Sequence, residues 1–273
     1  MNKTIPLVVI TILVFGFVMQ PSVFGSNEKK EDKEFKIPPG LSEIAPGVLS
    51  LGKSKDVNGT EVEGIMFIHS KKESAKPSGA STPSGTTCYA FLTKGGVKWT
   101  APKPWIVNPS NSGGLDPSFV PGNIALNIAK WEDASDGLLG NNLGIDIMGS
   151  GSSTTNTLTA DSSSPDGKNE IYFADISSSG TIAVTTTWYN RFTKQIVEMD
   201  QVFDDKDYGW SASGEPGKMD FENISNHELG HGIGMGHPSD RCPDETMYRY
   251  ANYGETTKRS LNAGDIAGIN ALY

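Results

Sequence analysis

The residues best suited to chemistry lie together at positions 227–237, which read HELGHGIGMGH. His227 and His231 are four residues apart, so on a helix both imidazoles lie on one face and can bind the same metal ion. Glu228 is rotated by about 100° from His227 and can reach a water molecule on that ion as a general base. The spacing therefore predicts a helix that carries two metal ligands and a base.

His237 supplies a third imidazole if the chain turns sharply after His231. Gly234 stands where the predicted helix ends, and glycine adopts the left-handed conformation of such an end without steric cost. Three neutral histidines leave one position of a zinc ion open for water, which is typical of catalytic zinc sites. We therefore expect one catalytic zinc ion at His227, His231 and His237.

These eleven residues resemble the zinc signature HExxHxxGxxH of the metzincin metallopeptidases, and residues 105–273 resemble the catalytic domain of the matrixins. The resemblance implies that Met247, ten residues after His237, forms the methionine turn that supports the ligands. It also implies that Tyr248 lines the substrate pocket. Residues 181–189 correspond to an edge strand, along which an extended peptide substrate can pair.

The fold implied by this resemblance is α+β. It consists of a twisted, mixed, five-stranded sheet with an active-site helix, a backing helix and a small C-terminal subdomain that ends in a helix. The implied activity is that of a zinc-dependent endopeptidase acting on polypeptides. A metal-holding, non-peptidolytic binding or adhesion module of the cell envelope is the alternative, and Glu228 argues against it because metal binding alone needs no base.

Three features of the matrixins are missing from the sequence. The cysteine-switch motif PRCGxPD is absent, and Gly264 stands where matrixins have the first of two adjacent aspartates. The sequence has four histidines, and His69 is the one outside the signature. A single histidine cannot build a second zinc site. The matrixin route of activation is therefore not predicted for this chain.

The composition limits the partners of the protein. Its 273 residues carry a formal charge of −9, which argues against nucleic acid or an anionic membrane surface as a partner. The apolar and charged fractions are ordinary for a soluble globular protein. We expect a monomer that meets a polypeptide substrate.

Residues 1–25 have the pattern of a signal peptide. Lys3 precedes an apolar run at residues 6–19, and residues 23–25 offer a cleavage site before Ser26. Cleavage there predicts a secreted or cell-surface protein with no membrane contact after processing. An uncleaved anchor is the alternative, since the apolar run lies near the lower length limit of a spanning helix.

Residues 26–87 are predicted to form an N-terminal extension or a removable pro-segment. Two short strands at residues 48–51 and 62–68, with Asn58 and Gly59 between them, indicate a small β unit. A stretch rich in Ser, Pro and Gly at residues 71–87 reads as a linker and marks the domain boundary. The catalytic domain is assigned to residues 88–273.

Two cysteines are present, Cys88 and Cys242, and an even count in an exported chain favours a disulfide. The alternative is that Cys88 is a free thiolate that blocks the zinc ion of a latent enzyme.

The remaining patterns indicate how the metal helix is held. A helix is predicted at residues 118–131 and another at residues 261–273, and strands at 170–176, 181–189 and 195–203 should share one sheet. Asp220 suits the N-cap of the metal helix. A run of carboxylates has ligands that calcium prefers, although a solvated strand end is the favoured interpretation; its members are Asp200, Asp204, Asp205 and Asp207.

Overall fold

The computed structural model describes residues 33–71 and 85–273. The predicted signal peptide at residues 1–25 and most of the predicted linker lie outside the described residues. Within the described ranges, no helix has the length and apolar character needed to span a membrane.

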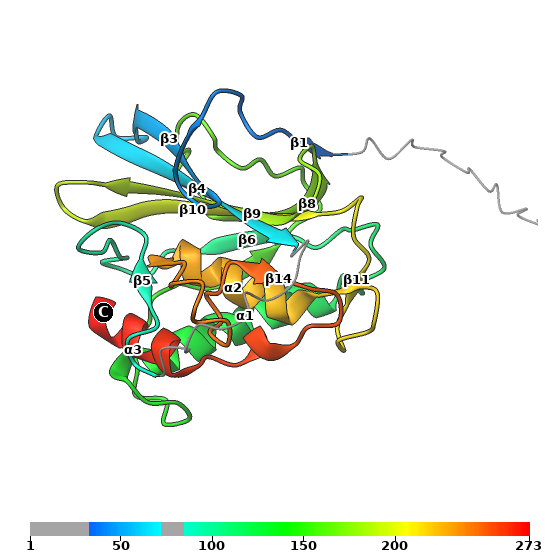
Figure 1. Ribbon diagram of the computed structural model, residues 1–273. Helices are drawn as coiled ribbons and strands as arrows, with labels where there is room; N and C mark the ends of the chain where they lie inside the picture. Colours follow the sequence, from blue (N-terminus) through cyan, green and yellow to red (C-terminus); the bar gives the residue numbers. More distant parts are fainter. Residues whose placement is uncertain (1–32, 72–84) are drawn as a thin grey trace, which may run out of the picture. The chain divides into compact units, whose positions relative to one another are not determined.

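One sheet of ten strands dominates the described residues (Figure 1). Its order is β2-β3-β4-β9-β10-β8-β6-β7, with β1 paired to β8 and β14 paired to β4. The strands are β1 (Glu34–Phe35), β2 (Ser42–Ala45), β3 (Val48–Lys55), β4 (Glu61–Lys71), β6 (Trp105–Asn108), β7 (Gly151–Ser153), β8 (Glu170–Ile176), β9 (Thr181–Asn190), β10 (Gln195–Asp204) and β14 (Tyr250–Ala251).

The sheet is mixed, as predicted, but it has more than the five strands expected. Strands β7, β6, β8 and β10 run parallel to one another, and β9 is antiparallel to β10. The additional strands come mainly from the N-terminal residues, which were expected to form a small β unit of their own. They extend the main sheet because β4 is apolar on both sides: Ile65 and Phe67 join the core next to the helices, and Met66 joins the core on the opposite face.

Strand β9 is consequently not the edge strand that the resemblance implied. It pairs with β10 along one side and with β4 along the other. The register joins Phe67 to Thr185 and His69 to Ala183. Residues from the N-terminal extension therefore occupy the place that was expected for a substrate.

The helices lie on one face of the sheet (Figure 1). They are α1 (Phe119–Asp133), α2 (Phe221–Gly232) and α3 (Ala263–Leu272), with 3-10 turns η1 (Ala134–Asp136) and η2 (Thr257–Arg259). The predicted helices at 118–131 and 261–273 are confirmed as α1 and α3. Large buried rings fill the space between the sheet and the helices, among them Trp131, Phe203 and Phe221.

Four short strands complete the elements in two separate pairs. Strands β11 (Trp210–Ser211) and β12 (Met219–Asp220) are parallel, and β13 (Met235–Gly236) is antiparallel to β5 (Ala90–Phe91). The predicted N-cap of α2 is confirmed, since the Asp220 carboxylate accepts the Asn223 backbone N–H at 3.0 Å.

The acidic run is a solvated strand end only in part: Asp207 is exposed and Asp205 half-buried after β10, whereas the two carboxylates on β10 are not solvated. Asp200 is buried, and its carboxylate accepts the backbone N–H groups of Asp161 and Glu170 at 2.9 and 3.0 Å. Asp204 is also buried and accepts the N–H of Ile176 at 3.0 Å. These carboxylates are stable in buried positions because they accept hydrogen bonds from backbone N–H groups that the sheet leaves unpaired.

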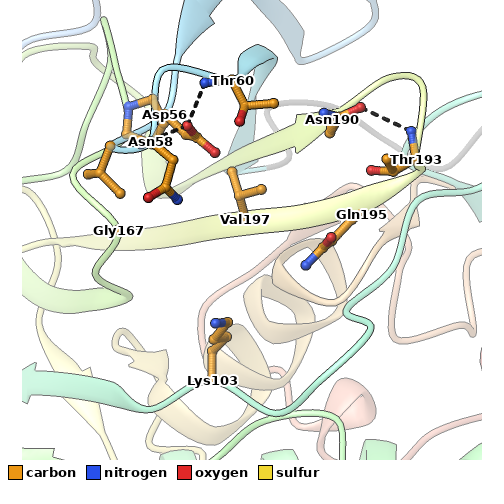
Figure 2. Close-up of a pocket in the computed structure, with 11 residues that line it drawn as sticks. Asp56, Asn58, Thr60, Lys103, Gly167, Asn190, Thr193, Gln195 and Val197 are labelled. Atoms are coloured by element: carbon orange, nitrogen blue, oxygen red, sulfur yellow. Dashed lines mark hydrogen bonds between the residues drawn. The ribbon is translucent and has the colours of Figure 1, made fainter.

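A pocket of about 390 Å³ opens where the β3–β4 and β9–β10 turns meet (Figure 2). The turns are held by side chains: Asp56 accepts the N–H of Thr60 at 2.8 Å, and Asn190 accepts that of Thr193 at 3.0 Å. None of the residues predicted for catalysis lines this pocket. The predicted metal site is therefore separate from this pocket.

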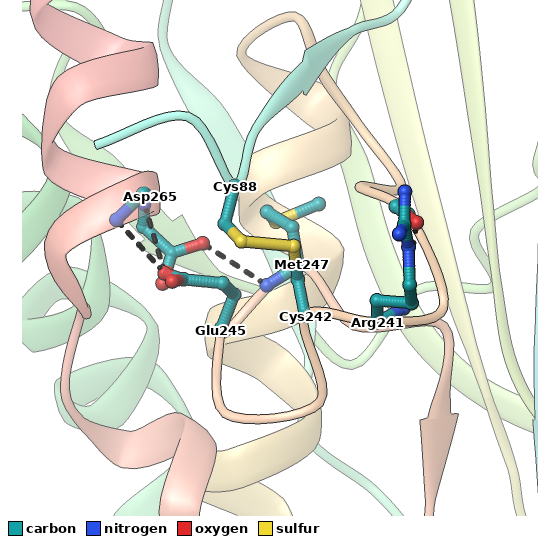
Figure 3. Close-up of a disulfide and its surroundings, with 8 residues drawn as sticks. Cys88, Arg241, Cys242, Glu245, Met247 and Asp265 are labelled. Carbon is teal, nitrogen blue, oxygen red and sulfur yellow. Dashed lines mark hydrogen bonds between the residues drawn. A yellow bond between two sulfur atoms is a disulfide. The ribbon is translucent and has the colours of Figure 1, made fainter. Parts of the chain in front are cut away.

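Cys88 and Cys242 are joined by a disulfide (Figure 3). The bond fastens the chain just before β5 to the segment that follows β13. Because Cys88 is bonded to Cys242, it is not a free thiolate in this structure.

We predict that replacing both cysteines by alanine lowers the free energy of unfolding by about 2–5 kcal/mol. The upper part of that range is expected because the bond closes a separation of 154 residues, which greatly restricts the unfolded chain. Denaturant unfolding without reductant gives the value. Reductant should destabilise the native protein and leave the double variant unchanged; an equal effect on both would contradict a disulfide role.

Candidate metal centre

The three predicted ligands converge on one point. His227 and His231 stand one turn apart on α2, and the Nε2 atom of His231 lies 3.0 Å from the Nε2 atoms of both His227 and His237. Helix α2 ends at Gly232, and Gly234 turns the chain with a φ of 109°, as predicted. A Cβ atom at Gly234 would also lie 2.1 Å from the Val97 carbonyl oxygen, so only glycine fits.

Hydrogen bonds fix which nitrogen of each helical histidine is free. The Nδ1 atom of His227 lies 2.7 Å from the Thr246 carbonyl oxygen, and that of His231 lies 2.9 Å from the Met235 carbonyl oxygen. Since a carbonyl oxygen only accepts, each Nδ1 carries the hydrogen and each Nε2 presents a lone pair.

This arrangement suits a cation. Burial lowers the pKa of His231 to about 4 and that of His227 well below its usual value, so both imidazoles are neutral. Two buried lone pairs that face each other at 3.0 Å repel unless a positive ion lies between them. With His237 as the third nitrogen, the donor set fits zinc and leaves a fourth coordination position.

Glu228 lies beside the histidines and is fully buried. Its Oε2 atom accepts the Thr185 hydroxyl at 2.6 Å, and its Oε1 atom lies 2.8 Å from Nδ1 of His69. Burial raises the pKa of the Glu228 carboxyl to about 7, whereas the nearby His231 and the Thr185 hydrogen bond act to lower it. Burial lowers the pKa of His69 to about 3, so its imidazole is neutral.

Side chains from β4 cover the metal ligands. The Phe67 ring stacks on His231 with 3.8 Å between ring centroids, and the His69 ring lies 4.0 Å from that of His227. A second group of residues that could hold an ion consists of His69, His227 and Glu228, and it shares His227 with the first.

The Met247 side chain packs against Gly230 of α2, and its role as a support for the ligands stays a prediction. A Cβ atom at Gly230 would lie 2.2 Å from the Met247 sulfur and 2.9 Å from the Trp131 ring, so the side chains fill the space beneath this turn. The Met247 backbone N–H donates to the Asp265 carboxylate at 3.2 Å, and that of Thr246 donates to it at 2.7 Å. Because the Thr246 carbonyl binds His227, Asp265 positions this ligand from below.

A second carboxylate, Glu245, lies against Asp265 (Figure 3). Its Oε2 atom accepts the N–H groups of Gly264 and Asp265 at the start of α3. Burial, followed by repulsion from Asp265, raises the pKa of Glu245 to about 7. A Cβ atom at Gly264 would lie 2.3 Å from the Cys88 carbonyl oxygen, which explains why no aspartate stands there.

Tyr248 is buried next to Met247, with its ring 5.8 Å from that of Tyr250. Its place in a substrate pocket stays a prediction. The residues that the sequence did not assign are His69, Phe67, Thr185 and Asp265. The sequence contains one indication that His69 belongs to the site. It is the only histidine outside the signature, and it directly follows an apolar run.

A third group that could hold an ion, among the described residues, consists of Asp161, Asp166 and Glu198. Glu198 is buried and accepts the Gly167 backbone N–H. Within the acidic run proposed from the sequence, Asp200 and Asp204 bind backbone N–H groups instead, so calcium stays a prediction for this chain.

Part of the chain resembles known proteins. Residues 175–273 match the family model of the matrixins. Over 69 residues, the chain is 41% identical to matrilysin of Rattus norvegicus and 39% identical to matrilysin of Homo sapiens. Each alignment covers 25% of this chain and 25% of the relative, so the match spans about a quarter of the length of these curated relatives. Strand β4 lies outside the residues that match the family model.

We predict that Glu245→Gln flattens the dependence of stability on pH. The pKa of Glu245 rises from 4.5 to about 7 on folding, so the carboxyl stays protonated to a higher pH in the folded state than in the unfolded state. The free energy of unfolding therefore falls as the pH rises from 4.5 to 7. Glutamine keeps the acceptor for the Gly264 N–H but does not titrate. Between pH 4.5 and 7 the native protein should lose roughly 1–3 kcal/mol more than the variant.

The measurement is chemical denaturation at several pH values, with the exposed Glu215→Gln as the control. Parallel pH profiles for the native protein and Glu245→Gln would contradict the raised pKa.

Proposed function

We propose that the protein is a secreted zinc-dependent endopeptidase, and the match of residues 175–273 to the matrixin family model supports this proposal. The observation that carries the proposal is the convergence of the histidine Nε2 atoms at 3.0 Å, with a buried carboxylate beside them. His227, His231 and His237 would hold the zinc ion, and an extended polypeptide is the substrate. We assign the catalytic domain to residues 88–273.

The zinc ion, when bound, supplies Lewis-acid chemistry that polarises the scissile carbonyl and activates water. Glu228 acts as the general base: its Oε1 atom takes the proton of the attacking water and delivers it to the leaving amine. Thr185 holds the other carboxylate oxygen at 2.6 Å and so orients the base. In the covered state described here, burial raises the pKa of Glu228 to about 7, which makes its carboxylate a stronger proton acceptor there.

The residues beneath the site position the ligands and do not touch the substrate. Asp265 holds the Thr246 backbone, whose carbonyl orients His227, while Met247 fills the space under Gly230. We extend the proposal to a monomer with a cleaved signal peptide at residues 1–25, which would place the disulfide in an oxidising compartment.

We predict that Glu228→Gln retains zinc but lowers hydrolysis of an unfolded protein substrate by about 10²–10⁴-fold. Glutamine keeps an acceptor for Thr185 but cannot accept the proton of water. Hydrolysis is measured with the chain from residue 26 before and after cleavage at a site engineered into residues 72–84, and zinc is measured by metal analysis. Glu215→Gln, at an exposed carboxylate, is the matched control.

Equal rates of hydrolysis by Glu228→Gln and the native chain would contradict the assignment of Glu228 as the general base. If the uncleaved and the cleaved native chain each bind one zinc ion and neither hydrolyses the substrate, the protein is instead a metal-holding binding module. A chelator should abolish hydrolysis in the native chain.

A further inference from the structure

Strand β4 lies where an extended peptide would be expected to bind. It pairs with β9 in an antiparallel register from Glu63 to Ser70, and Ser70 and Lys71 pair in parallel with β14. Strand β9 precedes the metal helix, and β14 follows Met247. Strand β3 pairs with the other edge of β4 from Glu61 to Phe67. The pairing of β4 with β9 uses the same backbone hydrogen bonds as a peptide that adds to a sheet.

The side chains of β4 close the metal site from above. Phe67 stacks on His231, and the His69 ring packs against that of His227 at a tilt of 31°. His69 also meets the Oε1 atom of Glu228 at 2.8 Å, while Thr185 holds Oε2. His69 therefore takes up a position beside Oε1 that an attacking water molecule would need in order to reach Glu228.

The site is also closed to a polypeptide by burial. His69, His227, Glu228 and His231 are all 0% exposed. A pocket of about 520 Å³ reaches His237 from the side, between Phe67 and β5. This side entrance gives an ion or a small chelator a route to one ligand. Tyr189 of β9 lines it, but the backbone edge of β9 stays paired with β4.

His69 is an unusual residue for a strand with a purely structural role. Its Nε2 atom is buried without a hydrogen-bond partner among the described residues, which an apolar side chain at this position would avoid. The contact with Glu228 therefore comes at a cost to the stability of the covered state. Such a cost is tolerated where a contact serves the site rather than the core.

We propose that residues 61–71 occupy the polypeptide-binding channel as an internal peptide, and that His69 blocks Glu228, so that the chain is latent until β4 leaves. This inference rests on the proposed function. A cut within residues 72–84 would leave β4 without a covalent link to the domain, which starts at the Cys88–Cys242 disulfide. Substrate then competes with β4 for the same edge of β9.

Gly64 offers a way to displace β4 without touching the metal site. A Cβ atom there would lie 2.7 Å from the Trp188 ring of β9, so Gly64→Val pushes the two strands apart. Gly122→Ala on α1 is the matched control, since a Cβ atom at Gly122 meets nothing within 4 Å. His69→Ala frees the Glu228 oxygen but keeps the strand pairing, and His69→Asn restores a donor to it.

The probe is a fluorescent peptide hydroxamate, which needs both the metal and the peptide channel, with binding measured by anisotropy on zinc-loaded protein. The chain from residue 26 should bind it weakly. Cleavage within residues 72–84 and removal of the released fragment, or Gly64→Val, should tighten apparent binding by about 100-fold, because the competent fraction rises. A synthetic peptide of residues 61–71 should displace the probe from the cleaved chain, and the same peptide with H69A should do so less well.

Equal probe affinity for the intact and cleaved chains would overturn the proposal. Thermal unfolding and zinc content show whether Gly64→Val is folded; if it is not, the comparison of the cleaved chain with the two peptides still decides. Hydrolysis separates the two proposals. A cleaved chain that binds the probe but does not hydrolyse protein contradicts the proposed function alone, whereas an intact chain that hydrolyses at the rate of the cleaved chain contradicts latency alone.

Discussion

Imidazole nitrogens that converge at 3.0 Å inside a protein must be held there against their mutual repulsion. The fold does this from several directions. Backbone carbonyls of Thr246 and Met235 fix the rings of the two helical ligands. Met247 fills the space under Gly230, and Asp265 holds the Thr246 and Met247 backbone. The disulfide then fastens the segment between the third histidine and Met247 to the start of β5. The rigidity of the site therefore comes from residues that are far apart in the sequence.

Burial has two opposite consequences for Glu228. It raises the pKa of the carboxyl to about 7, which suits a general base, and it keeps water away from the same group. In the described structure both carboxylate oxygens are bound by protein, one of them through His69. In the proposed latent state, β4 both extends the sheet and holds His69 against Glu228. Departure of β4 would expose β9 and Glu228 together, so access to the channel and release of the base are one event.

Local features of the metal helix could be predicted from the sequence, because they depend on residues within a few positions of each other. The helical spacing of His227 and His231, the N-cap at Asp220 and the turn at Gly234 are of this kind. The place of β4 could not be predicted in the same way, since its partners lie more than a hundred positions further along the chain. An apolar run on both faces indicates an interior strand, and residues 65–68 have that pattern, but no pattern names the neighbour. The hydrogen bonds that connect Asp265 to His227 through the Thr246 backbone could not be predicted from the sequence for the same reason.

X-ray absorption spectroscopy of the zinc-loaded protein tests most directly whether this site is a histidine-bound zinc centre. We expect at least three imidazole nitrogens at about 2.0–2.1 Å from the zinc ion and no sulfur ligand. His237→Ala should remove one imidazole from the spectrum. A sulfur scatterer at about 2.3 Å, or a native spectrum with fewer than three imidazoles, would contradict the assignment of His227, His231 and His237 as the zinc ligands.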